Sequence, residues 1–109
     1  MAPRVEFLWW QECPSWERAL VDLRKAMSEA GLDPEDIEVT RVDSEPDAER
    51  ERFPGSPTIR VDGADVEPPA NGEATGLVCR VYRRPDGRVS PLPDPENVRA
   101  ALDRAAGRP

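Results

Sequence analysis

The stretch RVEFLWWQECPSW, residues 4–16, decides the fold. It begins with alternating apolar and charged residues and continues as an aromatic and aliphatic run, which predicts a strand that becomes fully buried. Pro14 suits the first turn of a helix, where the missing N–H of proline costs nothing. The stretch therefore predicts a buried strand that leads through Cys13 into a helix.

A helix is expected after Pro14 because apolar residues recur there at steps of three and four. Gly31, a residue type that commonly ends helices, follows the last of them. This spacing places the apolar residues on one face of a helix. They are Trp16, Ala19, Leu20, Leu23, Ala26, Met27 and Ala30.

Three further strands are expected from β-branched and alternating apolar residues, at residues 37–42, 58–61 and 76–83. The third of the chain's four strands ends at Asp62-Gly63, which is a strong signal for a tight turn. Residues 64–75 are expected to form a loop. The last strand then pairs antiparallel with the strand over residues 58–61.

Two more helices complete the expected order. Glu45-Pro46-Asp47 favours a short helix to about Arg52, because proline and acidic residues suit a first turn. The proline-rich segment 91–95 precedes a helix with Val98 and Leu102 on its apolar face. The result is one α/β domain over residues 1–109, with the order β-α-β-(α)-β-β-α and a four-stranded mixed sheet.

The composition excludes several classes of site. The 109 residues include no histidine and only two cysteines. Catalytic triads and histidine-ligated metals are therefore impossible, and two thiols cannot supply a four-cysteine metal centre. The formal net charge of −7 argues against a nucleic-acid or anionic-membrane binder. No cofactor is expected.

The N-terminal sequence predicts a cytoplasmic location. It carries no apolar segment of the signal-peptide type, and no apolar run approaches the length of a membrane span. Cytoplasmic thiols are normally reduced, so a transient disulfide is expected rather than a permanent one.

Cys13 is the residue with the clearest chemical potential. It falls between the end of a strand and the start of a helix, at the edge of an α/β sheet where ligands and catalytic groups gather. Free helix N–H groups stabilise a thiolate there, whereas the nearby Glu12 and Glu17 oppose a second negative charge. We expect an exposed, partly activated thiol; the alternative is a buried structural cysteine.

Two motifs resemble the thioredoxin/glutaredoxin superfamily. They are Cys13-Pro14-Ser15-Trp16 ahead of a helix, and Gly55-Ser56-Pro57-Thr58 at the opening of a strand. The resemblance covers residues 4 to about 105. It is strongest to bacterial thioredoxin-like domains and looser to the alkylmercury-lyase-like branch.

The resemblance implies a role for three residues and a thioredoxin-like fold. Cys13 matches the nucleophilic cysteine of the family, and Pro57 matches the cis-proline that faces it. Ser56 matches the residue whose backbone pairs with a bound thiol substrate. The sequence departs from the family at Trp16, which stands in the place of the second, resolving cysteine.

Without a resolving cysteine at position 16, two routes to thiol exchange remain. A monothiol cycle through a mixed disulfide with a small thiol needs only Cys13. Alternatively, Cys79 resolves the intermediate from a distance. The pattern around Cys79 favours a third interpretation, in which Cys79 is a small buried core residue with Leu77 and Val81 on one apolar face.

Three tryptophans gather around Cys13. Trp9 and Trp10 are consecutive in a strand and must point to opposite faces. We expect Trp16 and one of this pair to join the core, while the other lines the rim of the site. Trp10, Pro14 and Trp16 are therefore candidate binding residues beside Cys13.

Other side chains admit two interpretations. Arg80, Arg83 and Arg84 could bind an anionic substrate such as glutathione, or they could protect an edge strand from aggregation.

Three functions follow in order of preference. The first is thiol–disulfide oxidoreduction with a small thiol or a protein disulfide, with Cys13 as the nucleophile. The second is capture of a soft metal or an organomercurial by Cys13 and Cys79. The third is a degenerate copy of the fold that binds a partner protein.

Overall fold

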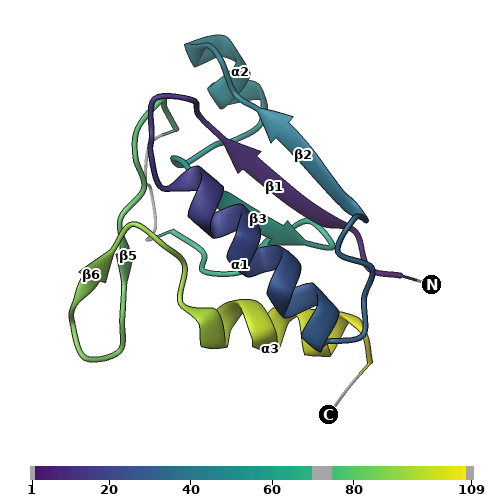
Figure 1. Cartoon of the computed structure of the whole chain (residues 1–109). Coiled ribbons are helices and arrows are strands. Elements are labelled where there is room, and N and C mark those ends of the chain that lie inside the picture. Colours follow the sequence, from purple (N-terminus) through teal and green to yellow (C-terminus); the bar gives the residue numbers. More distant parts are fainter. Residues whose placement is uncertain (1, 70–74, 108–109) are drawn as a thin grey trace.

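The computed structural model describes residues 2–69 and 75–107 (Figure 1). Its main sheet has the strand order β2-β1-β3-β4. These strands are β1 (Val5–Trp9), β2 (Ile37–Arg41), β3 (Thr58–Val61) and β4 (Ala64–Asp65). β1 is parallel to β2 and antiparallel to β3, and β4 is antiparallel to β3. The predicted α/β class and four-stranded mixed sheet are confirmed.

Two of the three helices cover one face of this sheet. α1 (Trp16–Glu29) and α3 (Pro95–Ala105) lie against each other on that face (Figure 1). α2 (Glu45–Arg50) follows β2, and β5 (Tyr82–Arg83) pairs with β6 (Val89–Ser90) in a separate hairpin. Within the described ranges, no helix is long and apolar enough to cross a membrane.

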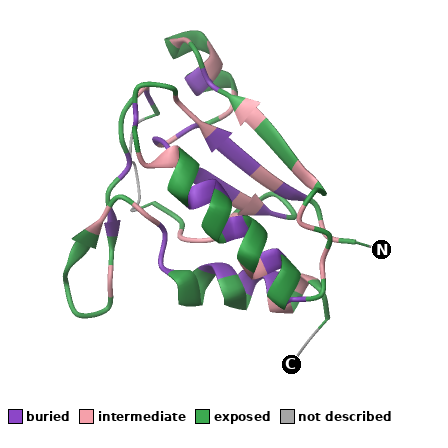
Figure 2. Cartoon of the chain, viewed as in Figure 1, coloured by how far each residue is buried: buried purple, intermediate pink, exposed green. Residues whose placement is uncertain are grey.

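β1 is buried on both sides because an apolar cluster packs against each face of the sheet (Figure 2). Val5 and Phe7 point toward α1 and α3, whereas Leu8 points to the opposite face. The larger cluster consists of Val5, Phe7, Ala19, Leu20, Leu23, Met27, Ala30, Ile59, Val61, Val98, Ala101 and Leu102. The smaller cluster consists of Leu8, Val42, Ala48 and Phe53, with Trp10 and Leu77 packed against it.

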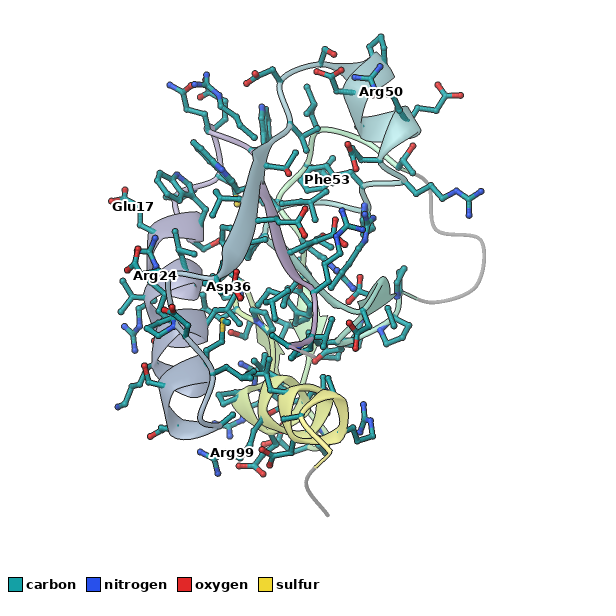
Figure 3. The ribbon with its side chains drawn as sticks, turned by 90° about the vertical axis from the view of Figure 1, so that its right-hand side faces the viewer. Glu17, Arg24, Asp36, Arg50, Phe53 and Arg99 are labelled. Carbon is teal, nitrogen blue, oxygen red and sulfur yellow. The ribbon has the colours of Figure 1, made fainter. Side chains whose placement is uncertain are left out.

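α2 and α3 begin where the sequence predicts, whereas α1 begins at Trp16, two residues after the proline expected to open it. The side chain of Ser44 caps α2, and that of Asp94 caps α3 by accepting a hydrogen bond from the backbone of Glu96 at 3.0 Å. Figure 3 shows Glu17 and Arg24 on the outer side of α1, and Phe53 inside the molecule. The amphipathic spacing therefore predicted both the extent and the inner face of α1.

The predicted fourth strand over residues 76–83 is wrong. Asp62 and Gly63 both adopt positive φ angles, of 51° and 85°, which give the tight turn that the sequence predicts. The chain reverses at this turn at once, and β4 takes the place beside β3. In the segment 76–83 only Tyr82 and Arg83 belong to a strand, and they pair with β6.

Residues 79–82 also face the opposite way from the one expected. Arg80 and Tyr82 point inward and are buried, whereas Cys79 and Val81 are exposed. The inward position of Arg80 is stable because its charge is paired with that of Asp65. Hydrophobic alternation alone cannot reveal such a pairing, since it assigns an arginine to the solvent side.

Candidate dithiol site

Cys13 lies in the loop that joins β1 to α1. Its N–H donates to the carbonyl oxygen of Trp10 at 3.2 Å. Its Sγ lies 3.5 Å from Ser15 Oγ and 3.5 Å from the carbonyl oxygen of Ser56. Cys13 is only 1% exposed, so the expectation of an exposed thiol is wrong: its sulfur lies against Ser15 and the distant Ser56.

Ser56 forms hydrogen bonds with several other segments of the site. Its Oγ accepts a hydrogen bond from the N–H of Trp10 at 2.9 Å. Its own N–H donates to the carbonyl of Val78 and its carbonyl accepts from the N–H of Arg80, each at 2.8 Å. The Ser56–Pro57 peptide bond is cis, as the resemblance implies. The backbone groups expected to receive a substrate are thus bonded to the chain itself.

Cys79 lies beside Ser56 in an isolated parallel bridge. The residue is exposed, so its interpretation as a buried core cysteine is wrong. Hydrogen bonding with Cys13 raises the pKa of Cys79 to about 11, and burial and the charge of Cys13 act in the same direction. Cys13 and Cys79, which are both free thiols, thus both lie against the backbone of Ser56.

Gly55 allows the segment that carries Cys79 to approach closely. Its φ of +140° is a conformation that residues with side chains rarely adopt. A Cβ at this position would lie 3.1 Å from both Arg80 Cβ and Val78 Cγ2. The glycine thus leaves the space into which Val78 and Arg80 pack on either side of Cys79.

Arg80 anchors the same segment from the inside. Its Nη1 donates to Asp65 Oδ2 at 2.7 Å and to Thr58 Oγ1 at 3.2 Å, and its Nη2 donates to the carbonyl oxygen of Glu67. Its guanidinium carbon also lies 4.4 Å from the ring centroid of Tyr82. Arg80 is 7% exposed, so neither suggested role, anion binding or protection of an edge strand, is right for it.

Tyr82 adds a second anchor to the backbone around the cis bond. Its hydroxyl donates a hydrogen bond to the carbonyl oxygen of Pro57. Burial raises the pKa of Tyr82 far above its ordinary value, so the phenol stays neutral and keeps this proton. Neither Arg80 nor Tyr82 was predicted to hold this segment. The available signal was the alternation of Val78, Arg80 and Tyr82, whose middle residue is an arginine.

The tryptophans lie as the strand geometry predicts. Trp9 stacks on Trp16, with ring centroids 4.1 Å apart, and both pack against the larger cluster. Trp10 points to the other face and packs against the smaller cluster. Pro14 is exposed next to Cys13. Trp16 and Trp9 are therefore the core pair, and Trp10 is left as the candidate for the rim.

Comparison with known proteins finds no matching family model, no matching curated protein and no matching solved structure. The residues described here contain no group of three or more histidine, cysteine, aspartate or glutamate side chains arranged to hold a metal ion.

Proposed function

We propose that this chain is a thioredoxin-like thiol protein that performs thiol–disulfide exchange through Cys13 and Cys79. The observation that carries the proposal is that Cys13 and Cys79 both lie against the backbone of Ser56. Two thiols held next to each other can exchange one disulfide for two thiols within one chain, which a lone cysteine cannot do.

The arrangement around the pair supports a thioredoxin-like relationship. Cys13 stands between β1 and α1, and Ser56 and Pro57 lie ahead of β3 against it. Trp16 begins α1 and stacks on Trp9, where the family has its resolving cysteine. In this proposal Cys79, from a later part of the chain, supplies the second sulfur.

The exchange conserves atoms and electrons. The Cys13 thiolate uses its electron pair to form a bond to one sulfur of a disulfide, and the other sulfur leaves as a thiolate that takes up a proton. When the attacked sulfur is that of Cys79, the product is a Cys13–Cys79 disulfide. The protein then has lost two electrons, which the partner disulfide has gained.

The direct test is redox equilibration of the whole chain in buffers of reduced and oxidised glutathione. We expect an intramolecular disulfide that mass spectrometry detects as the loss of two hydrogen atoms and maps to Cys13 and Cys79. Cys13→Ser and Cys79→Ser should each abolish it. The proposal is wrong if no such disulfide forms, or if Cys13→Ser keeps full activity toward model disulfides.

The same pair favours a second candidate function, which is the capture of a soft metal ion. Two adjacent thiolates suit linear coordination of Hg(II) or Cu(I). Titration of the reduced protein with Hg(II) should then give a tight one-to-one complex that is lost in both Cys13→Ser and Cys79→Ser. A complex that survives the loss of Cys79 would rule this function out.

A further inference from the structure

The two cysteines of the pair differ in access to solvent. Cys13 is 1% exposed, whereas Cys79 is exposed. A thiol–disulfide exchange needs the attacking sulfur to approach the sulfur atom that it bonds to, so access decides which of two cysteines an external partner reaches. In the folded protein that access is open at Cys79 and closed at Cys13.

The surroundings of Ser56 close the other route to Cys13. An extended peptide that docks on an exposed backbone edge needs free N–H and C=O groups. At Ser56 these groups are bonded to Val78 and Arg80 of the same chain. The N–H and C=O of Ser56 would become free only if residues 78–80 moved away from it. Arg80 would then lose its contacts with Asp65, Thr58 and Glu67.

We propose that Cys79 is the residue that bonds to the external partner, and that Cys13 acts only inside the protein, on the sulfur of Cys79. This inference rests on the proposed function and deepens it. It also reverses the order that the resemblance implies, in which the cysteine ahead of the helix meets the substrate. The partner is a thiol or disulfide that reaches an exposed cysteine without pairing with Ser56.

The reduction of the oxidised protein then proceeds in two balanced steps. An external thiolate attacks Cys79 Sγ, the bond between the two cysteines breaks, and Cys13 leaves with the electron pair and takes a proton. A second external thiolate attacks the external sulfur of the mixed disulfide, and Cys79 leaves as the thiolate. The products are the reduced protein and one external disulfide.

The reverse direction uses Cys13 as the internal nucleophile. After Cys79 has formed a mixed disulfide, the Cys13 thiolate attacks Cys79 Sγ and the external thiol leaves. The raised pKa of Cys79 makes its own first attack on an external disulfide slow at neutral pH. The same raised pKa makes Cys79 a slower leaving group in the last step of reduction, so it slows both directions of exchange at this sulfur.

The test maps the mixed disulfide in the wild-type chain. Protein carrying the Cys13–Cys79 disulfide is mixed briefly with glutathione and quenched with acid. Free thiols are then blocked with N-ethylmaleimide, and the peptides are analysed by mass spectrometry. We expect glutathione on Cys79 and maleimide on Cys13. Glutathione found on Cys13 would overturn the inference.

Single-cysteine variants give a second, independent measurement. With oxidised glutathione at one pH, Cys79 in Cys13→Ser should react on the order of tenfold faster, or more, than Cys13 in Cys79→Ser, because the buried thiol reacts only when the structure opens locally. In urea the two rates should become similar, which shows that the fold causes the difference. Faster reaction of Cys13 in the folded protein would contradict the inference.

The failure of this inference is distinct from the failure of the proposed function. If no disulfide between the two cysteines forms at any glutathione ratio, the proposed function is wrong. If the disulfide forms but the external group maps to Cys13, the proposed function stands and only the assignment of the roles is wrong.

Discussion

Cys79 lies beside Ser56 in a parallel bridge, with the N–H and the carbonyl of Ser56 each bonded at 2.8 Å to a neighbour of Cys79. The carbonyl oxygen of Ser56 also accepts from Cys13 Sγ at 3.5 Å. Ser56, a single residue that precedes β3, thus contacts both cysteines, which come from distant parts of the chain. Substitutions that move the segment around Cys79 away from Ser56 should therefore disturb the pairing of the two cysteines more than they disturb the packing of the core.

Gly55→Ala tests the close packing of that segment. We expect a loss of about 1–3 kcal/mol in the free energy of unfolding from the positive φ alone, and more because a Cβ would lie 3.1 Å from Arg80 Cβ and Val78 Cγ2. Formation of the Cys13–Cys79 disulfide should also slow. Urea unfolding and the rate of disulfide formation measure the two effects.

Gly87→Ala is the matched control for this substitution. Gly87 has a φ of +90°, but no atom would lie within 4 Å of an added Cβ. The control should show the backbone strain alone and leave disulfide formation unchanged. Equal losses of stability in the two variants, with equal rates of disulfide formation, would refute the role assigned to Gly55.

Arg80→Met tests the buried ion pair under the site. The variant leaves the carboxylate of Asp65, whose side chain is only 11% exposed, without its partner. Removal of one member of a buried pair costs about 3–5 kcal/mol, because the remaining charge is uncompensated. We expect a loss of this size in urea unfolding, and partial recovery when Asp65→Asn is added.

An exposed arginine provides the comparison. Arg88 pairs with Asp86 on the surface, with its side chain 82% exposed, and such pairs contribute about 0–1 kcal/mol. Arg88→Met should therefore be nearly neutral. If Arg80→Met were as mild as Arg88→Met, Arg80 would not anchor the segment that carries Cys79.

The sequence predicted those parts of the fold that depend on local periodicity. The spacing from Trp16 to Ala30 predicted α1, and the β-branched run 58–61 predicted β3. The cis bond at Pro57 was implied by the resemblance to the thioredoxin/glutaredoxin superfamily and not by periodicity. The turn at Asp62-Gly63 was also predicted, but its consequence was not. A turn this tight forces immediate pairing, so β4 fills the edge that residues 76–83 were expected to occupy.

The sequence predicted which residues form the candidate site but not how they are arranged. Cys13, Ser56 and Cys79 were all identified, yet exposure was expected for Cys13 and burial was favoured for Cys79. The error at Cys79 has its cause in the inward position of Arg80, the residue next to it. A buried arginine depends on a partner such as Asp65 that is distant in the sequence, and hydrophobic periodicity carries no information about it.

Ser56→Ala distinguishes the contribution of the Ser56 hydroxyl from that of its backbone N–H and C=O. The variant keeps the hydrogen bonds to Val78 and Arg80 but removes the Oγ that accepts from the N–H of Trp10 at 2.9 Å. An unsatisfied buried donor costs about 1–3 kcal/mol, which urea unfolding should detect, while the Cys13–Cys79 disulfide still forms.

Ser28→Ala on the exposed side of α1 is the control for this loss. A surface substitution of this kind should change stability by no more than about 0.5 kcal/mol. If the two alanine variants unfold at the same urea concentration, the bond between Trp10 and Ser56 contributes no net stability.

The raised pKa of Cys79 predicts how its reactivity and its contribution to stability depend on pH. The pKa rises from 9.0 to about 11, chiefly through hydrogen bonding with Cys13. Between these values the folded protein keeps a proton that the unfolded chain releases. The contribution of Cys79 to the free energy of unfolding is therefore constant below 9.0, and it falls as the pH rises toward about 11.

Cys13→Ala removes the main cause of this shift, and the pKa of Cys79 should return toward 9.0. The measurement is the rate of alkylation of Cys79 by iodoacetamide as a function of pH, followed by mass spectrometry of the peptide that contains it. Because thiolates and not thiols are alkylated, the midpoint of the rate curve reports the pKa. An unchanged midpoint in Cys13→Ala would show that Cys79 does not interact with Cys13.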